Sequence, residues 1–169
     1  MNISSPWQLI IIICIVIFII WSANSLAKQN KRTYKVIRNI TERKCSHQLR
    51  IINRYRKNKG LRPLHAYYEM DKIAKGHSYY MAKHRSINHN GFDSRAMAVR
   101  TKTHSSNVGE NCIQYPAKTY NNKVAEKLVE TWMKSPGHRK NLMNPLFSKI
   151  GIGIVVKRGQ VYGVQIFAG

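Results

Sequence analysis

The chain has 169 residues, enough for one domain with its own hydrophobic core and little more. Lys and Arg number 29 against 7 Asp and Glu, a formal net charge of +22, and every charged residue follows Ala27. Such a body attracts nucleic acid, anionic lipid headgroups or anionic cell-surface polymer, and the plain alternative is a self-repelling soluble surface without a specific partner.

Residues 1–27 predict a transmembrane anchor. Leu9–Ile20 is an unbroken apolar run, and Trp7 and Trp21 flank it as residues of a membrane-interface belt would. A bilayer needs about 20 residues, a length reached only if the segment is extended to Ala27. The small residues at its end suit signal-peptide cleavage, but no Lys or Arg precedes the run. We expect an uncleaved anchor, with a cleaved signal peptide as the alternative.

Residues 28–45 follow as a basic juxtamembrane linker that we expect to lie near anionic lipid. Its first eleven residues contain five basic side chains: Lys28, Lys31, Arg32, Lys35 and Arg38. Taken alone, the positive-inside rule would place the rest of the chain in the cytoplasm.

Three helices are predicted in the remaining domain, residues 46–169. The first begins at Ser46 and ends at Gly60, a natural C-cap. The second carries the apolar periodicity of Met70–His84. Long loops follow from Ser86, and a third helix begins at Asn121 or Asn122 and carries Val124, Leu128 and Trp132 on one face.

The carboxy-terminal segment predicts an antiparallel hairpin. In "KIGIGIVV" the residues Ile150, Ile152 and Ile154 share one face, and Gly151 and Gly153 fall on the other. These glycines leave room for a helix to pack closely. Helices combined with such a hairpin indicate an α+β domain.

The segment "SPGHR" between the third helix and the hairpin contains two successive residues that disfavour a continuous helix. Pro136 cannot continue a helix, and Gly137 gives access to backbone angles that other residues avoid. We interpret both as presenting His138 in a defined orientation.

Several motifs share an order and spacing with a known family. They are "INRYRKNKGLRPL", "HSYYMA", "NHNGFDSR" (Asn88–Arg95), "GEN" (Gly109–Asn111), "SPGHR" after a helix with Trp132, "NLMNPLFSKIGIGIV" and "VQIFAG". Over residues 46–169 the chain resembles the CAP superfamily in its bacterial and archaeal SCP-like form. The resemblance implies an α-β-α sandwich, with a small antiparallel sheet between helical layers and a cleft lined by two histidines and acidic residues.

By this resemblance the cleft residues are His89, Glu110 and His138. The second acid of animal and plant members follows the tryptophan, where this chain has Met133-Lys134-Ser135, so that acid is absent. Further candidates for the cleft are Asn111, Glu130, which precedes the tryptophan, and Arg95 as a partner for an acid.

Two neutral imidazoles and one carboxylate can hold a divalent cation such as Zn²⁺, and His89, His138 and Glu110 are the expected ligands. Without metal, the same three residues would form a charged hydrogen-bond network. A third interpretation is that Glu110 and Asn111 organise loops through buried backbone groups. His77 and His84 are expected to be core or boundary residues.

The expected function is a membrane-tethered, cell-surface binding module whose cleft holds a divalent metal or a small apolar ligand. The alternative is a metal-dependent, peptidase-like hydrolase, although no His-Glu-x-x-His or Gly-x-Ser-x-Gly motif is found. Nucleic acid is the least expected partner, because no helix-turn-helix, zinc-finger or RNP-type signature accompanies the charge.

The resemblance favours an extracytoplasmic domain, against the charge pattern, with secretion after signal cleavage as the alternative. In an oxidising compartment Cys45 and Cys112 could form a disulfide, and two free thiols are the competing expectation.

Overall fold

The computed structural model describes the backbone of residues 6–169 and the side chains of residues 15–32 and 47–169. The chain divides into two compact units, residues 1–42 and 43–169. Helix α1 (Pro6–Lys57) contributes to both units, so the helix predicted to begin at Ser46 is the end of a much longer one.

The first unit is helical. Its side chains from Ile15 to Trp21 are all large, apolar and exposed, with between 47% and 66% of each accessible. Among the residues that the structure describes, no helix is long and apolar enough to cross a bilayer. The predicted anchor begins before the first described side chain and stays a prediction.

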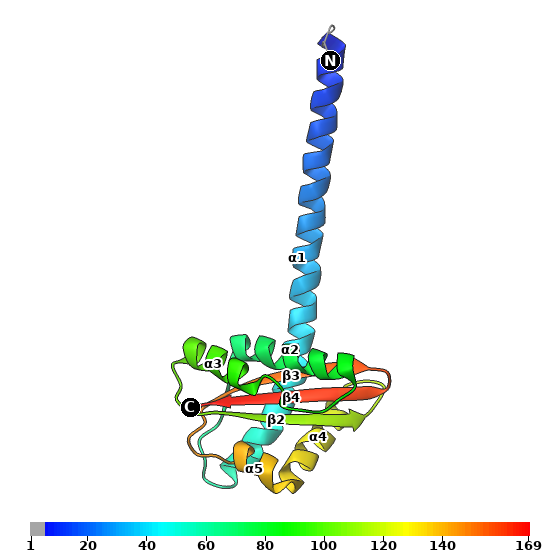
Figure 1. Ribbon diagram of the computed structural model, residues 1–169. Helices are drawn as coiled ribbons and strands as arrows, with labels where there is room; N and C mark the ends of the chain where they lie inside the picture. The colour runs from blue at the N-terminus through cyan, green and yellow to red at the C-terminus, as the bar shows by residue number, and fades with distance from the viewer. Residues whose placement is uncertain (1–5) are drawn as a thin grey trace. The chain divides into compact units, whose positions relative to one another are not determined.

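The second unit is an α+β domain with helices on both faces of one sheet (Figure 1). Its remaining elements are β1 (His65–Ala66), α2 (Tyr68–His84), α3 (Phe92–Thr103), β2 (Val108–Pro116), α4 (Asn122–Lys134), α5 (Pro136–Leu142), β3 (Lys149–Lys157) and β4 (Gln160–Ala168). In the sheet order β1-β3-β4-β2, the short strand β1 runs parallel to β3 and the other pairs are antiparallel. The sheet is therefore mixed, which corrects the prediction of an antiparallel one.

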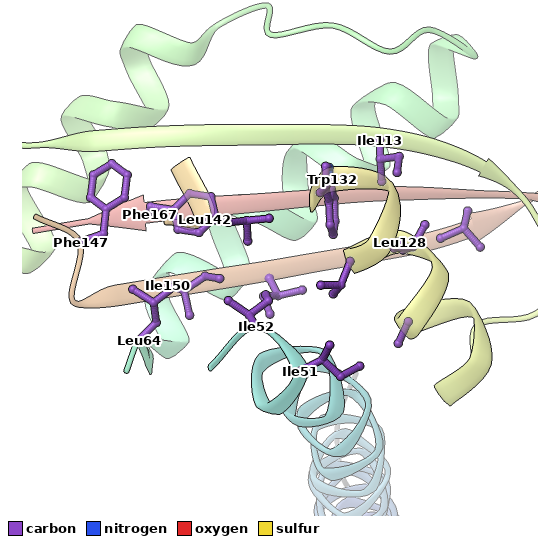
Figure 2. Packing of buried hydrophobic residues seen from close by; sticks show 14 of the residues in the cluster. Ile51, Ile52, Leu64, Ile113, Leu128, Trp132, Leu142, Phe147, Ile150 and Phe167 are labelled. Carbon is purple, nitrogen blue, oxygen red and sulfur yellow. The ribbon is translucent and has the colours of Figure 1, made fainter. Parts of the chain in front are cut away.

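Two hydrophobic clusters separate the layers. One lies between the sheet and the last turns of α1 with α4, and Trp132 is completely buried within it (Figure 2). The other lies between the sheet and α2 with α3, and Met70 and Val164 are completely buried there. Figure 1 shows α2 and α3 on one face of the sheet and α4 and α5 on the other, the layers of an α-β-α sandwich.

The predicted hairpin is confirmed, with β3 and β4 joined by a two-residue loop. Its glycines have the predicted role. A Cβ added at Gly151 would lie 2.3 Å from the carbonyl carbon of Met70, and one at Gly153 would lie 2.2 Å from the backbone nitrogen of Lys75. Helix α2 therefore packs with its backbone directly against β3.

Four elements, β1, α3, β2 and α5, were not predicted individually. Helix α3 and the first half of β2 lie between Ser86 and Cys112, where long loops around short elements were expected. The third predicted helix is confirmed as α4, with the Asn121 side chain accepting a hydrogen bond from the backbone nitrogen of Val124 at 3.1 Å. Pro136 does end α4, but it also begins α5, where a proline suits the first position. Gly137 lies inside α5 and not in a left-handed conformation, which corrects the interpretation given to it.

Arg56 joins the end of α1 to the segments around α5. It is completely buried, and its guanidinium donates hydrogen bonds to the backbone oxygens of Arg62, Leu142, Asn144 and Phe147 at 2.8–3.1 Å. Burial lowers its pKa. Each of these carbonyls lies in a loop or at a helix end, so one side chain fixes the backbone on which α5 is carried.

Candidate functional site

The site is built on β2, an edge strand of the sheet. Alternate residues of a strand point to opposite faces. Glu110 and Cys112 therefore point to the face of the sheet that α2 and α3 cover, and Cys112 belongs to the cluster on that side. Asn111 and Ile113 point to the opposite face, which α4 and α5 cover, and Ile113 belongs to the cluster there. Gly109 faces α5 closely, since a Cβ there would lie 3.0 Å from the Asn141 side chain. The three residues of "GEN" thus contact helices on both faces of the sheet.

The carboxylate of Glu110 is the centre of a buried network. Its side chain is only 1% exposed. Arg95, on α3, donates from Nε to Oε2 and from Nη2 to Oε1, both at 2.7 Å. His89 Nδ1 lies 2.8 Å from Oε1, and the Cys112 thiol donates to the same oxygen at 3.6 Å. Both oxygens are therefore engaged by donors of the protein itself.

Two pKa values reflect this arrangement. Burial acts to raise the pKa of Glu110, but the hydrogen bonds from Arg95 and His89 outweigh it and hold the pKa below its usual value. Burial, reinforced by the neighbouring Glu110 carboxylate, raises the pKa of the Cys112 thiol far above its usual range. Glu110 is thus an ionised acceptor and Cys112 a protonated thiol.

The loop before α3 places His89. His77 on α2 contacts the Asn88 backbone oxygen through Nε2 at 2.8 Å, and the Asn90 backbone nitrogen donates to the Asn88 side chain at 3.0 Å. Arg95 also donates to the Asn90 backbone oxygen at 2.7 Å. The His89 imidazole is 53% exposed, so Glu110 holds it by Nδ1 while the ring reaches the surface.

Asn111 positions α5 and with it His138. Asn111 is completely buried, and its amide nitrogen donates to the His138 backbone oxygen at 3.1 Å and to the Gln165 side chain at 3.2 Å. Asn141, one turn further along α5, donates to the Asn111 side-chain oxygen at 2.9 Å and to the Glu110 backbone oxygen at 3.2 Å. Helix α5 is thereby fastened to the strand that carries the carboxylate.

The imidazole of His138 is partly buried, and burial lowers its pKa. The nearby charge of His89 lowers this pKa further, although the two residues come from opposite layers of the sandwich. Both effects favour a neutral His138 ring near pH 7, with a nitrogen lone pair available to a ligand.

The remaining candidates have other surroundings. Glu130 lies on α4, where its carboxylate accepts a hydrogen bond from Lys127 at 2.9 Å. His77 is buried, and burial lowers its pKa, whereas His84 is exposed and lies against Tyr80. Cys112 is a free, buried thiol, and the side chain of Cys45, its proposed disulfide partner, lies outside the described residues.

One group near the site was missed by sequence reasoning. Ligand-type atoms of His77, Glu110 and Cys112 lie within 4.8 Å of one another. The spacing of Glu110 and Cys112, two apart on one strand, could have indicated that they share a face once β2 was recognised. Nothing local in the sequence connects His77 to them.

An α-β-α sandwich whose edge strand carries a buried carboxylate bound by Arg95 and His89 defines a class of domain that matches a known family. The model of the CAP family, described as the cysteine-rich secretory protein family, matches residues 49–167. The uncharacterised protein YkwD of Bacillus subtilis (strain 168) is 30% identical over 122 residues, which are 68% of this chain and 43% of that protein. The chain belongs to the CAP family, and it spans less than half the length of this relative.

Solved structures agree with this fold. An outer surface protein from Borrelia burgdorferi superimposes with a TM-score of 0.64 at 21% identity, covering 76% of this chain and 93% of that one. An extracellular protein containing an SCP domain from Bacillus anthracis gives a TM-score of 0.55 at 26% identity, covering 73% of this chain and 39% of that one. A cysteine-rich secretory protein from Staphylococcus aureus gives 0.54 at 23% identity, with 75% and 38% covered.

Proposed function

We propose that this chain is an extracytoplasmic, membrane-tethered binding module whose ligand site consists of the imidazoles of His89 and His138. The observation that carries the proposal is the contact between His89 and the buried Glu110 carboxylate. An ionised carboxylate only accepts hydrogen bonds, so Nδ1 of His89 must carry the proton. In the neutral ring, Nε2 then holds the free lone pair.

This arrangement fits a divalent cation such as Zn²⁺. A histidine that ligates a metal commonly donates its other ring N–H to a carboxylate, which fixes the ring and raises its basicity. Glu110 would serve His89 in this way, and His138 would supply the second nitrogen. We therefore propose Glu110 as an orienting group and not as a direct ligand, because Arg95 already occupies both of its oxygens. The other coordination positions would be left to water or a bound molecule.

The buried group of His77, Glu110 and Cys112 fits a metal less well. Both oxygens of Glu110 are already bound by Arg95, and Nε2 of His77 donates to a backbone oxygen, which leaves only Nδ1 of that ring as a possible ligand. The raised pKa of Cys112 keeps the thiol protonated, whereas a metal binds the thiolate. We assign His77 and Cys112 to packing around Glu110.

The hydrolase alternative is disfavoured by the same geometry. A general base must be free to take a proton at the operating pH. Glu110 is bound by a guanidinium and its pKa is lowered, so it is a weak base with no free oxygen to meet a water. The protonated Cys112 is equally unsuited as a nucleophile.

The extracytoplasmic location rests on relatives described as an outer surface protein and an extracellular protein. The tether rests on the apolar run Leu9–Ile20, whose side chains from Ile15 onward are exposed. Protease added to intact cells should digest residues 43–169. Protection in intact cells, with digestion only after lysis, would place the domain in the cytoplasm and contradict this part of the proposal.

Metal uptake tests the site itself. We expect the full chain in a neutral detergent to bind about one equivalent of Zn²⁺ in equilibrium dialysis, and His89→Ala and His138→Ala each to weaken binding at least about tenfold. His84→Ala is the matched control, because His84 is exposed at the end of α2 and should leave uptake unchanged. Circular dichroism would verify that each variant is folded. Equal uptake by folded His138→Ala and the parent chain would rule out the proposed pair.

A further inference from the structure

A pocket lies at the hairpin end of the sheet, and none of the residues discussed above as ligands lines it. It has a volume of about 270 Å³ and is lined in part by Arg85, Lys157 and Arg158. These three cations come from the end of α2, the end of β3 and the β3–β4 turn. None of the seven lining residues is acidic, so the pocket gathers positive charge without a carboxylate to balance it.

The backbone of this pocket is strained at two of its arginines. Among the residues that the structure describes, three that are not glycine have positive φ, and two of them are Arg85 and Arg158, both at 52°. Arg85 ends α2 in the left-handed conformation, a position where helices favour glycine. Arg158 precedes Gly159, with φ 71°, in the two-residue hairpin turn, a position where asparagine is favoured.

Arginine therefore stands at two positions where another residue would fit the local backbone better, and both side chains line one pocket. A backbone strain that persists twice around the same cavity indicates a role for the side chains. Guanidinium groups present forked N–H donors that match the oxygens of phosphate. Lys157 adds a third charge, and its Nζ also lies 5.8 Å from the ring centre of the exposed Tyr79.

The rest of the lining is polar and suits hydroxyl groups. The Gln114 amide donates to the Gln160 side-chain oxygen at 3.4 Å. This leaves the carbonyl of Gln114 to accept a hydrogen bond and the amide of Gln160 to donate one. A ligand that carries hydroxyls next to its phosphate would use both groups, whereas inorganic phosphate would use the cations alone.

We propose that this pocket binds a polyol phosphate unit of an anionic cell-surface polymer. The phosphate would lie between Arg85, Lys157 and Arg158, and the hydroxyls would contact the two glutamines. The inference does not depend on the histidine site, because the two sites share no residue, but it rests on the proposed extracytoplasmic location.

The test uses glycerol 3-phosphate as the probe, titrated calorimetrically into the full chain in a neutral detergent. We expect saturable binding that is tighter than that of inorganic phosphate. Arg85→Asn and Arg158→Asn should each weaken binding at least about tenfold through the loss of a charge-assisted hydrogen bond. Each should also raise the melting temperature by about 2 °C, because asparagine tolerates the left-handed conformation better.

Opposite effects on stability and binding separate this proposal from a structural role. Variants that melt at a lower temperature, or that bind as well as the parent chain, would overturn it. Lys59→Asn is the charge-matched control, since Lys59 is exposed and lies outside the pocket. An equal loss of binding in Lys59→Asn would show that only net charge matters, and equal affinity for inorganic phosphate would overturn the polyol assignment.

A lipid headgroup carries the same phosphate chemistry, so a separate experiment must distinguish it from the polymer. Phosphatidylglycerol vesicles would be compared with the soluble probe for the parent chain and Arg158→Asn. If Arg158→Asn weakens vesicle binding but leaves glycerol 3-phosphate binding unchanged, the ligand is a membrane lipid and the polymer proposal fails.

Discussion

Glu110 depends on its neighbours more than any other charged side chain near the site. It is ionised although its carboxylate is almost completely buried, a state that desolvation alone would oppose. Arg95 supplies two of the hydrogen bonds that make this possible and also holds the backbone of Asn90 beside His89. Arg95 is therefore both a charge partner and an organiser of the loop.

We expect Arg95→Met to lower the free energy of unfolding by about 3–5 kcal/mol at pH 7, because it leaves a buried carboxylate without its cation. In the parent chain the pKa of Glu110 is lowered, so its stabilising contribution is present above the unfolded value near 4.5 and is lost as the pH falls below it. In the variant, burial raises this pKa, and protonation then relieves the penalty. The destabilisation should therefore shrink between pH 7 and pH 4 in urea titrations.

Arg100→Met is the matched control for this experiment. Arg100 is an exposed arginine on the same helix, and its loss should change stability by less than about 0.5 kcal/mol. If Arg95→Met were equally destabilising at pH 7 and pH 4, the effect would come from packing and not from the charge of Glu110.

At the scale of elements, the contact of α2 with β3 leaves no space for a side chain. We expect Gly151→Ala and Gly153→Ala each to destabilise the domain by about 3 kcal/mol or more, because the added methyl group would meet helix backbone and not a movable side chain. Gly76→Ala tests the same helix from its open side, where nothing lies within 4 Å of an added Cβ. This variant should be more stable by about 1 kcal/mol. Equal melting temperatures for Gly151→Ala and Gly76→Ala in thermal unfolding would contradict the close packing.

The elements that could be predicted were those whose burial follows a simple period. Helix α4 buries Leu128 and Trp132 on one face, and β3 alternates isoleucine with glycine, so each pattern is visible in the sequence. Helix α3 buries only small or short side chains, such as Ala96 and Thr103, and produces no apolar stripe. An element without an apolar stripe therefore gives no periodic signal in the sequence.

Strand β2 was hidden for a different reason. Its centre contains Glu110 and Asn111, which are buried because they bind Arg95 and α5 and not because they are apolar. The residues that build the site thereby removed the alternation by which a strand is recognised. Resemblance to a family indicated His89 and Glu110 as neighbours in space, but Arg95 binds both carboxylate oxygens because of the position of α3, which no apolar pattern reveals.

For the whole molecule, acidic residues are unevenly distributed. No Asp or Glu occurs in residues 43–68 or 131–169, two stretches that together include the end of α1, all of α5 and the β3–β4 hairpin. Of the acids between them, Glu110 is buried in its network and Glu126 and Glu130 each pair with a basic side chain. The end of α1, α5 and the hairpin therefore carry basic side chains with no acidic side chain of their own.

We expect the fragment 28–169 to sediment with vesicles that contain anionic lipid and to be released as the salt concentration rises. Each Lys or Arg near such a surface contributes about 1 kcal/mol, and the screening length shortens from about 10 Å at 0.1 M salt to about 3 Å at 1 M. Neutral vesicles are the control. Binding to them as strong as to the anionic ones, or binding that salt does not alter, would show that charge is not the cause.

The position of Glu110 and Asn111 on successive residues of one edge strand limits how this chain can change in length. A single residue inserted before Gly109, with the strand still paired, would turn Glu110 toward the Trp132 side of the sheet and Asn111 toward Arg95. The Glu110 carboxylate would then lie in an apolar cluster, and the Arg95 guanidinium would lose its carboxylate partner. Insertion and deletion scanning should therefore find residues 108–113 intolerant of one added residue, while the exposed turn at Lys118 and Thr119 accepts it. Among homologous chains, length variation is expected in that turn and not in this strand.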